Sequence, residues 1–173
     1  MDKIIKIELS TKDINRAIKE IEKYRQDLQQ KVNIFRQRLA EELANEAQAG
    51  FDSAVVDDLV RGGMRKPDVT VLPPEDNGNV TVVIAKGNDA IFVEFGAGVY
   101  HNSSVGSSPH PLGAELGYTI GSYGKGYGKG KAWGYREDGD LKITRGTPAS
   151  MPMYNAMKSV IAKAITIARE VWK

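Results

Sequence analysis

Residues 14–49 read INRAIKEIEKYRQDLQQKVNIFRQRLAEELANEAQA, and this stretch decides the fold of the N-terminal part of the chain. Its apolar residues fall on one face of an α-helix, because they recur at the spacing of helical turns. They are Ile14, Ile18, Ile21, Leu28, Val32, Phe35, Leu39, Leu43 and Ala47. No proline or glycine interrupts the pattern before Gly50, and Ser10 or Thr11 can cap its start. The pattern predicts an amphipathic helix of roughly 35 residues, about 50 Å long.

This helix is longer than a small domain requires, since helices in compact domains average about 11–12 residues. The stripe resembles a coiled-coil seam, but Arg25, Glu42 and Glu46 stand where a strict seam has apolar groups. We interpret it as a helix that packs partly on its own sheet and is partly available to neighbours. A helix used only for packing within the chain is the alternative. With a short alternating strand before it, this helix makes up residues 1–50.

Residues 67–96 carry the pattern of a β-hairpin and a third strand. Apolar residues alternate around Val69 and again from residue 80 to 84, and Asn77-Gly78 supplies the turn between them. The short apolar run at residues 91–96 suits a strand or a single helical turn, and we assign it as the third strand.

Residues 97–142 change in character, because glycine and small polar residues dominate them. Ordinary loops have about 4–6 residues, so a segment of this length is expected either to have a function or to be partly disordered. Its aromatic residues argue against a plain linker, and we expect the segment to order against a partner. These residues are Tyr118, Tyr123, Tyr127, Trp133 and Tyr135.

A wide apolar stripe at residues 150–172 predicts a C-terminal helix that is buried on much of its circumference, with Pro152 in its first turn. The predicted architecture is a single α+β domain over residues 1–173. It consists of a small antiparallel sheet with a long N-terminal helix and a C-terminal helix packed on it, plus a long glycine-rich loop.

Composition argues against several classes of function. The chain has no cysteine and only two histidines, so we expect no disulfide, no metal site and no cofactor. The net charge of +2 gives no general argument for nucleic-acid binding. No apolar run approaches the roughly 20 residues of a membrane span, and no signal peptide is evident. We therefore expect a chain made in the cytosol that stays there unless it is built into an assembly.

Two candidate chemistries have simpler interpretations. The glycine-rich tract at residues 121–131 contains Gly-Lys pairs, but none is followed by Ser or Thr as a phosphate-binding Walker loop requires. Its lysines and tyrosines also suit single-stranded nucleic acid, which is the alternative function, although a solvated loop is the favoured interpretation. Serines near His101 and His110 lack the Gly-x-Ser-x-Gly elbow of a hydrolase, so we expect no catalytic residues and no enzyme.

Two segments resemble a known family. They are Val93-Glu94-Phe95-Gly96 and Thr144-Arg145-Gly146-Thr147-Pro148-Ala149-Ser150-Met151-Pro152-Met153. Together they resemble the tail-component, or tail-completion, proteins of long-tailed bacteriophages and Gram-positive prophages. In that family an acidic-aromatic-Gly signature ends a strand, and a Pro-Ala-x-Pro-like segment opens the C-terminal helix. Here Met153 stands where the family more often has Phe.

The resemblance implies a structural virion protein of the head–tail joint, or neck, that forms a ring between the connector and the tail tube. It implies self-association, with a hexamer as the expected ring, and contacts with connector, head-closure and tail-tube proteins. Contact with DNA is expected to be weak at most, and no membrane is involved. The expected location is the virion neck, and the host cytoplasm during assembly. The candidate interface residues are Glu94, Phe95, Tyr118, Tyr123, Tyr127, Trp133 and Tyr135.

Overall fold

The computed structural model describes residues 10–58, 63–96, 108, 110–113, 115–116, 133–144 and 146–173. The elements in chain order are α1 (Thr11–Ser53), β1 (Val56–Asp58), β2 (Gly63–Arg65), β3 (Thr70–Val71), β4 (Glu75–Asp76), β5 (Thr81–Val82), β6 (Ala85–Lys86), α2 (Ala90–Phe95), β7 (Trp133–Glu137), β8 (Asp140–Thr144) and α3 (Pro152–Val171). A long N-terminal helix, a C-terminal helix and small antiparallel sheets confirm the α+β class. The predicted strand before the first helix lies outside the described residues.

Helix α1 has 43 residues and is therefore about 65 Å long at 1.5 Å per residue. Ser10 caps it, because its hydroxyl oxygen accepts a hydrogen bond from the backbone N–H of Asp13 at 3.2 Å. The prediction ended this unit at Gly50, but the helix continues to Ser53. Gly50 has a different role: a Cβ at this position would lie 2.9 Å from the Cβ of Pro152, so glycine allows α3 to begin directly against α1.

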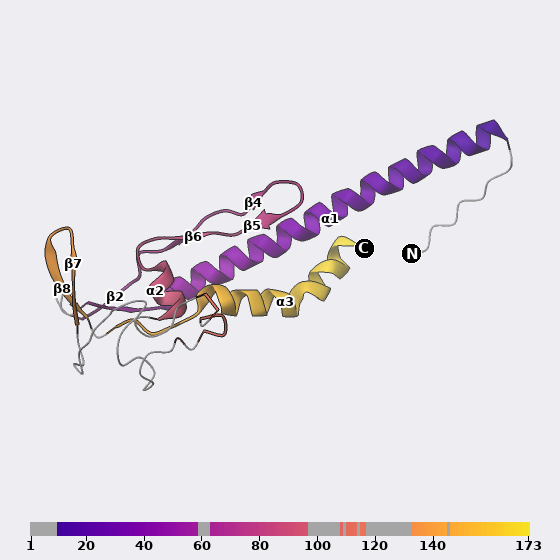
Figure 1. Ribbon diagram of the computed structural model, residues 1–173. Helices are drawn as coiled ribbons and strands as arrows, with labels where there is room; N and C mark the ends of the chain where they lie inside the picture. Colours follow the sequence, from indigo (N-terminus) through magenta and orange to yellow (C-terminus); the bar gives the residue numbers. More distant parts are fainter. Residues whose placement is uncertain are drawn as a thin grey trace.

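Helix α3 runs along the C-terminal half of α1 (Figure 1). The Phe35 and Trp172 rings meet edge to face at 5.4 Å between centroids, and Arg38 pairs with Glu170 at 2.9 Å. The prediction placed α3 on the sheet, whereas its main partners are α1 and α2. With only 20 residues, α3 ends opposite Phe35, and α1 extends well beyond it.

The predicted hairpin is present in two sections that follow the other side of α1. Strands β3 and β6 pair antiparallel, as do β4 and β5, and the chain turns at residues 77–80. Gln48 of α1 accepts a hydrogen bond from the backbone N–H of Val71 at 2.7 Å. Arg36 binds both carboxylate oxygens of Asp76 and the carbonyl of Gly78 near the tip. Polar side chains of α1 therefore hold the hairpin alongside the helix.

The third strand predicted at residues 91–96 is wrong, because this run forms helix α2. Its backbone N–H groups bond carbonyls four residues earlier, Val93 to Asp89 and Gly96 to Phe92, and the helix buries both Val93 and Glu94. A partly buried bidentate pair precedes the helix: the buried Asp89 binds Arg65 at 2.6 and 2.8 Å.

Part of the predicted loop 97–142 is also corrected. Residues 133–144 form the antiparallel pair β7–β8, with Trp133 opposite Thr144. Asp138 and Gly139 make the two-residue turn, both at positive φ, as such hairpins require. The pair β1–β2 was likewise not predicted. The described residues thus hold four separate two-stranded sheets rather than one sheet.

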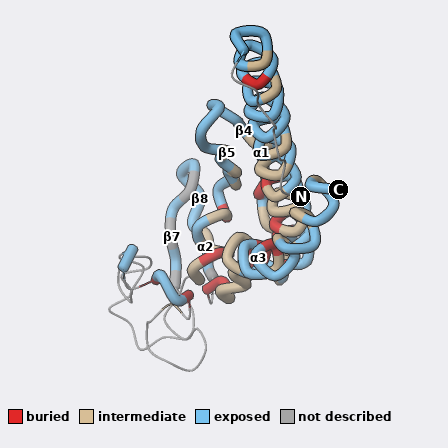
Figure 2. The backbone as a smooth tube through the Cα atoms, turned by 90° about the vertical axis from the view of Figure 1, so that its right-hand side faces the viewer, coloured by how far each residue is buried: buried red, intermediate tan, exposed pale blue. Residues whose placement is uncertain are grey.

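A small apolar core lies where the C-terminal end of α1, the β1 and β3 regions and α2 meet (Figure 2). Phe51 and Val93 are its most deeply buried large side chains. Ala54, Val56 and Val69 complete the buried cluster, and Met153 of α3 packs against it. Within the part of the chain that is described, no helix is both long and apolar enough to cross a membrane.

Candidate functional site

Glu94, one of the candidate interface residues, is buried within the subunit at the junction between α2 and α3. Its side chain accepts hydrogen bonds from the backbone N–H groups of Met153 at 2.8 Å and Tyr154 at 3.0 Å. It also contacts His110 Nε2 at 3.1 Å. Glu94 is 7% exposed, so its charge is used inside the fold and is not presented to a partner.

The start of α3 explains why a carboxylate is placed there. Pro152 is the first helical residue and has no N–H, so Met153 and Tyr154 carry the first N–H groups that lack a partner within the helix. The residue before the helix, Met151, gives no side-chain cap and stands in the left-handed region at φ 53°. The Glu94 carboxylate therefore replaces a local cap, and the helix dipole favours its negative charge.

The backbone joins the same two segments. The carbonyl of Val93 accepts a hydrogen bond from Ser150 N–H at 2.8 Å and a longer one from Met151 N–H at 3.4 Å. The two segments that carry the family resemblance are therefore bonded to each other, although about 60 residues separate Glu94 from its partners in α3. Neither segment can be changed without affecting the other.

His110 completes the junction as a structural residue. Its Nδ1 accepts a hydrogen bond from the Leu112 N–H at 3.0 Å, so Nε2 carries the proton and donates to Glu94. The ring is 6% exposed and packs between Phe95, at 4.4 Å between centroids, and Tyr154, at 5.1 Å. Both ring nitrogens are used, which leaves neither to serve as a base toward a bound substrate.

The serine beside it is used in the same way. The Ser108 hydroxyl donates to the carbonyl of Phe95 and accepts from the backbone N–H of His110 at 3.1 Å. A nucleophile would need a hydroxyl that donates to a histidine nitrogen. Among the described residues, no group of three or more His, Asp or Glu side chains is placed to hold a metal ion. The polar groups of Glu94, His110 and Ser108 are thus used in bonds within the fold.

The structure places only some of the other candidate interface residues. Phe95 is half-buried and packs on His110, so it belongs to the junction. Trp133 and Tyr135 lie on β7. Tyr118, Tyr123 and Tyr127 lie outside the described residues, as does the glycine-rich tract on which the nucleic-acid alternative depends.

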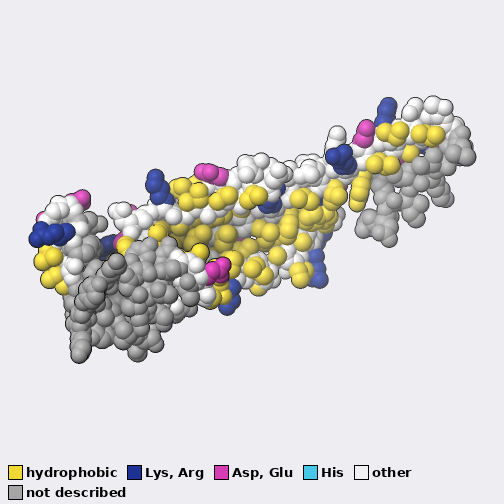
Figure 3. Space-filling view, in the orientation of Figure 1, with side chains coloured by type: hydrophobic (Ala, Val, Ile, Leu, Met, Phe, Trp, Pro, Cys, Tyr) yellow, Lys and Arg dark blue, Asp and Glu magenta, His cyan; other side chains and the backbone are white. Residues whose placement is uncertain are grey.

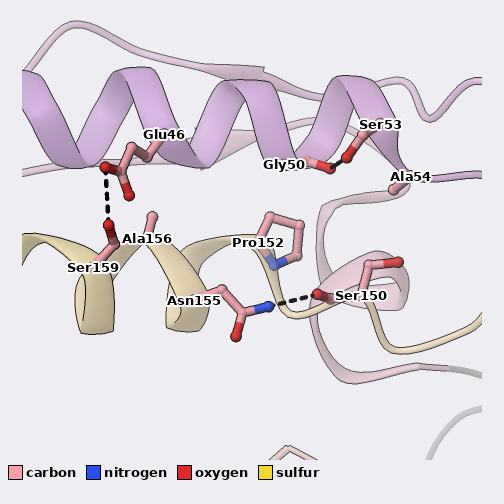
Figure 4. Close-up of a pocket in the computed structure, with 9 residues that line it drawn as sticks. All are labelled: Glu46, Gly50, Ser53, Ala54, Ser150, Pro152, Asn155, Ala156 and Ser159. Atoms are coloured by element: carbon pink, nitrogen blue, oxygen red, sulfur yellow. Dashed lines mark hydrogen bonds between the residues drawn. The ribbon is translucent and has the colours of Figure 1, made fainter.

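A cleft of about 400 Å³ lies between α1 and the first turns of α3 (Figure 4). Its polar side chains already bond one another: Ser159 donates to Glu46, and Asn155 donates to the carbonyl of Ser150. Ser53 likewise donates to the carbonyl of Gly50 within α1. Because these groups are paired, the cleft offers no converging set of free donors and acceptors to a ligand.

Exposed apolar side chains are the more distinctive surface feature (Figure 3). On α3, Met157, Ile161 and Ile165 follow one another at single-turn spacing, and the two isoleucines are 65% and 66% exposed. The prediction that α3 is buried on much of its circumference is wrong, because α1 and α2 cover only one side of it. We call Met157, Ile161 and Ile165 the α3 stripe. Contiguous exposed apolar side chains of this kind are typical of surfaces that bind another molecule.

Charged residues line the contact between α1 and α3. Lys163 of α3 bonds Glu42 at 2.6 Å and also bonds Glu46. The bonds to Glu42 and Glu46 raise the pKa of Lys163 to about 12. The bond to Lys163, followed by that to Ser159, lowers the pKa of Glu46 below its ordinary 4.5. Two of the polar residues that interrupt the predicted seam of α1 are thus matched by one lysine within the same chain.

Replacing Lys163 by methionine is expected to destabilise the protein at pH 7. The raised pKa of Lys163 means that its contribution is complete below pH 10.5 and is lost as the pH rises through about 12. The lowered pKa of Glu46 means that the contribution of Glu46 is lost as the pH falls below 4.5. Urea titrations at pH 7 and pH 3 should therefore show a smaller difference between the two proteins at pH 3. High salt should also reduce it, because Lys163 is 47% exposed.

The exposed Lys66, which lies away from the α1–α3 contact, provides the control as Lys66→Met. A difference for Lys163→Met that is equal at both pH values would contradict the ion-pair explanation.

Comparison of the chain with protein families, curated proteins and solved structures found no similar protein.

Proposed function

We propose that this chain is a structural protein of the head–tail joint of a long-tailed bacteriophage or prophage, where it forms a ring between the connector and the tail tube. In this role the protein binds neighbouring proteins of the assembly and catalyses no reaction. The proposal combines the family resemblance of two sequence segments with the contacts that these segments make.

The observation that carries the proposal is the junction at Glu94. The acidic-aromatic-Gly segment supplies the carboxylate that caps α3, and the Pro-Ala-Ser-Met-Pro segment supplies the helix start that the carboxylate caps. If the two signatures recur together in the tail-completion family, this single buried interaction gives a physical reason. It also explains why an acidic residue stands in an otherwise apolar run.

Ring closure joins two different surfaces of neighbouring subunits. The α3 stripe offers one apolar surface that the described part of the chain leaves largely uncovered. Apolar side chains on β8, Leu141 and Ile143, offer a second one at a distance from it (Figure 1). Contacts of this kind suit a subunit that assembles on neighbours and needs no active site.

The test is the mass of the purified protein over a concentration series, with electron microscopy of the largest species. We expect closed rings of about six subunits, either for the protein alone or after addition of connector-bearing heads. We also expect the double variant Ile161→Glu/Ile165→Glu to lose the rings while it keeps the far-UV spectrum, because both positions are exposed in the subunit.

The matched control is Ala162→Glu/Thr166→Glu, which adds two acids to exposed positions of α3 beside the stripe. In the phage itself, loss of the gene should leave filled heads and free tails that the purified protein joins. Normal infectious particles without the gene would overturn the proposal.

A further inference from the structure

The N-terminal half of α1 extends beyond the rest of the described structure (Figure 1). α3 ends opposite Phe35, and the hairpin tip is bound at Arg36, so neither element reaches the turns before these residues. We call residues 11–34 the arm. Most helical stability in proteins comes from packing of an apolar face, so an apolar face on the arm is expected to have a partner.

The arm has an apolar face of this kind, and most of it is exposed, although Ala17 at its edge is buried (Figure 3). Five aliphatic side chains on it are between 38% and 54% exposed. They are Ile14, Ile18, Ile21, Leu28 and Val32. These residues continue the face of α1 that packs on α3 from Phe35 onward, so the same seam is covered in one half of the helix and open in the other. A seam with this spacing fits another α-helix.

We propose that the arm pairs with the arm of a second copy of this chain, antiparallel and centred near residue 23. The seam positions 14, 18, 21, 25, 28 and 32 have spacings of four, three, four, three and four. This order reads the same in both directions, so the seam is complementary to itself when one helix is reversed. Ile14 then faces Val32 of the second copy, and Ile18 faces its Leu28.

Charge determines the direction of pairing. Arg25 is the one charged residue in this part of the seam, and a parallel pair in register would place it against Arg25 of the second copy. The antiparallel pair instead places each Arg25 next to Ile21 and Glu22 of the other arm. Because the dimer has a two-fold axis, this contact occurs twice, and the Arg25 of each copy lies beside Glu22 of the other.

The geometry of the subunit leaves room for this partner. The body of each copy lies at the C-terminal end of its own α1, so reversing one helix places the two bodies at opposite ends of an elongated dimer. The surface used is separate from the α3 stripe. The inference is independent of the proposed ring: a dimer without head–tail activity supports the pairing alone, and a ring without arm contacts supports the function alone.

Cysteine cross-linking tests the pairing directly, because the chain has no cysteine of its own. One variant carries Ile14→Cys and another carries Val32→Cys. Under mild oxidation, we expect a mixture of the two to give mainly the mixed disulfide dimer, and each variant alone to give little. A dominant disulfide between two copies of the Ile14→Cys variant would overturn the antiparallel direction.

Mass measurement tests the surface. With the ring contact removed by Ile161→Glu/Ile165→Glu, we expect the chain to form dimers, and the further changes Ile18→Asp/Leu28→Asp to raise the dissociation constant of this dimer by about a hundredfold or more. Ile18 and Leu28 are exposed in the subunit, so the fold of the body should be unchanged. Equal masses with and without the arm changes would overturn the proposal. A chain that is monomeric and dimerises only after removal of residues 2–9 would also overturn it, because the seam would then be used within the chain.

Discussion

Replacing Glu94 by alanine is expected to lower the free energy of unfolding by about 3–5 kcal/mol, because three N–H donors lose their acceptor and each one left unsatisfied in a buried site costs about 1–3 kcal/mol. The change leaves the backbone N–H groups of Met153 and Tyr154 without their acceptor. It also leaves the Nε2–H of His110 unpaired in a buried site. Urea unfolding followed by circular dichroism, at one low protein concentration, measures the effect.

The conservative variant Glu94→Gln separates charge from shape. Glutamine has one acceptor oxygen, and its amide nitrogen would face a backbone donor, so we expect an intermediate loss. Glu41→Ala, at an exposed position of α1, should change the stability by less than about 0.5 kcal/mol. A loss for Glu94→Ala no larger than that control would contradict the assignment of Glu94 as the cap of α3.

Replacing Gly87 by alanine is expected to lower the free energy of unfolding by about 3 kcal/mol or more, because a backbone group cannot move away at low cost. A Cβ at this position would lie 1.9 Å from the carbonyl oxygen of Asp68. Gly87 also has φ +151°, which L residues rarely adopt. The position follows β6, whose partner β3 begins two residues after Asp68. The variant should therefore separate the hairpin from the body.

Gly78 is the matched control, since it also has a positive φ but has no atom within 4 Å of an added Cβ. Gly78→Ala should cost only about 1–2 kcal/mol from backbone strain. Thermal unfolding of both variants compares the two contributions. Equal losses would mean that backbone conformation alone, and not the contact with Asp68, explains the need for glycine at position 87.

Local pattern was sufficient for the elements whose side chains repeat with a clear period. The apolar spacing from Ile14 onward predicted a long helix, and the alternation around Asn77-Gly78 predicted a hairpin. The hairpin β7–β8 also had a local signal, the Asp138-Gly139 turn, which was not used because the surrounding residues were assigned to one long loop. Here the information was present in the sequence, and the interpretation missed it.

The run at residues 91–96 illustrates a different limit. Six residues of mostly apolar character suit a strand and a helical turn equally, and period alone does not decide between them. Contacts decided it, since the helix buries Val93 in the core and turns Glu94 toward α3 at the same time. The core around Val93 is formed with residues about 24–42 positions away, and Glu94 bonds residues about 60 positions away, so no local pattern contains these contacts.

The sequence by itself determined the α+β class, the two main helices and the hairpin, because each depends on the periodicity of neighbouring side chains. Only the tertiary structure decided that Glu94 is a buried cap, that Glu42 and Glu46 meet Lys163, and that five aliphatic side chains of the arm stay exposed. The physical reason is the same in each case. Burial and pairing depend on which distant segment lies opposite, and α3 is too short to lie opposite the arm.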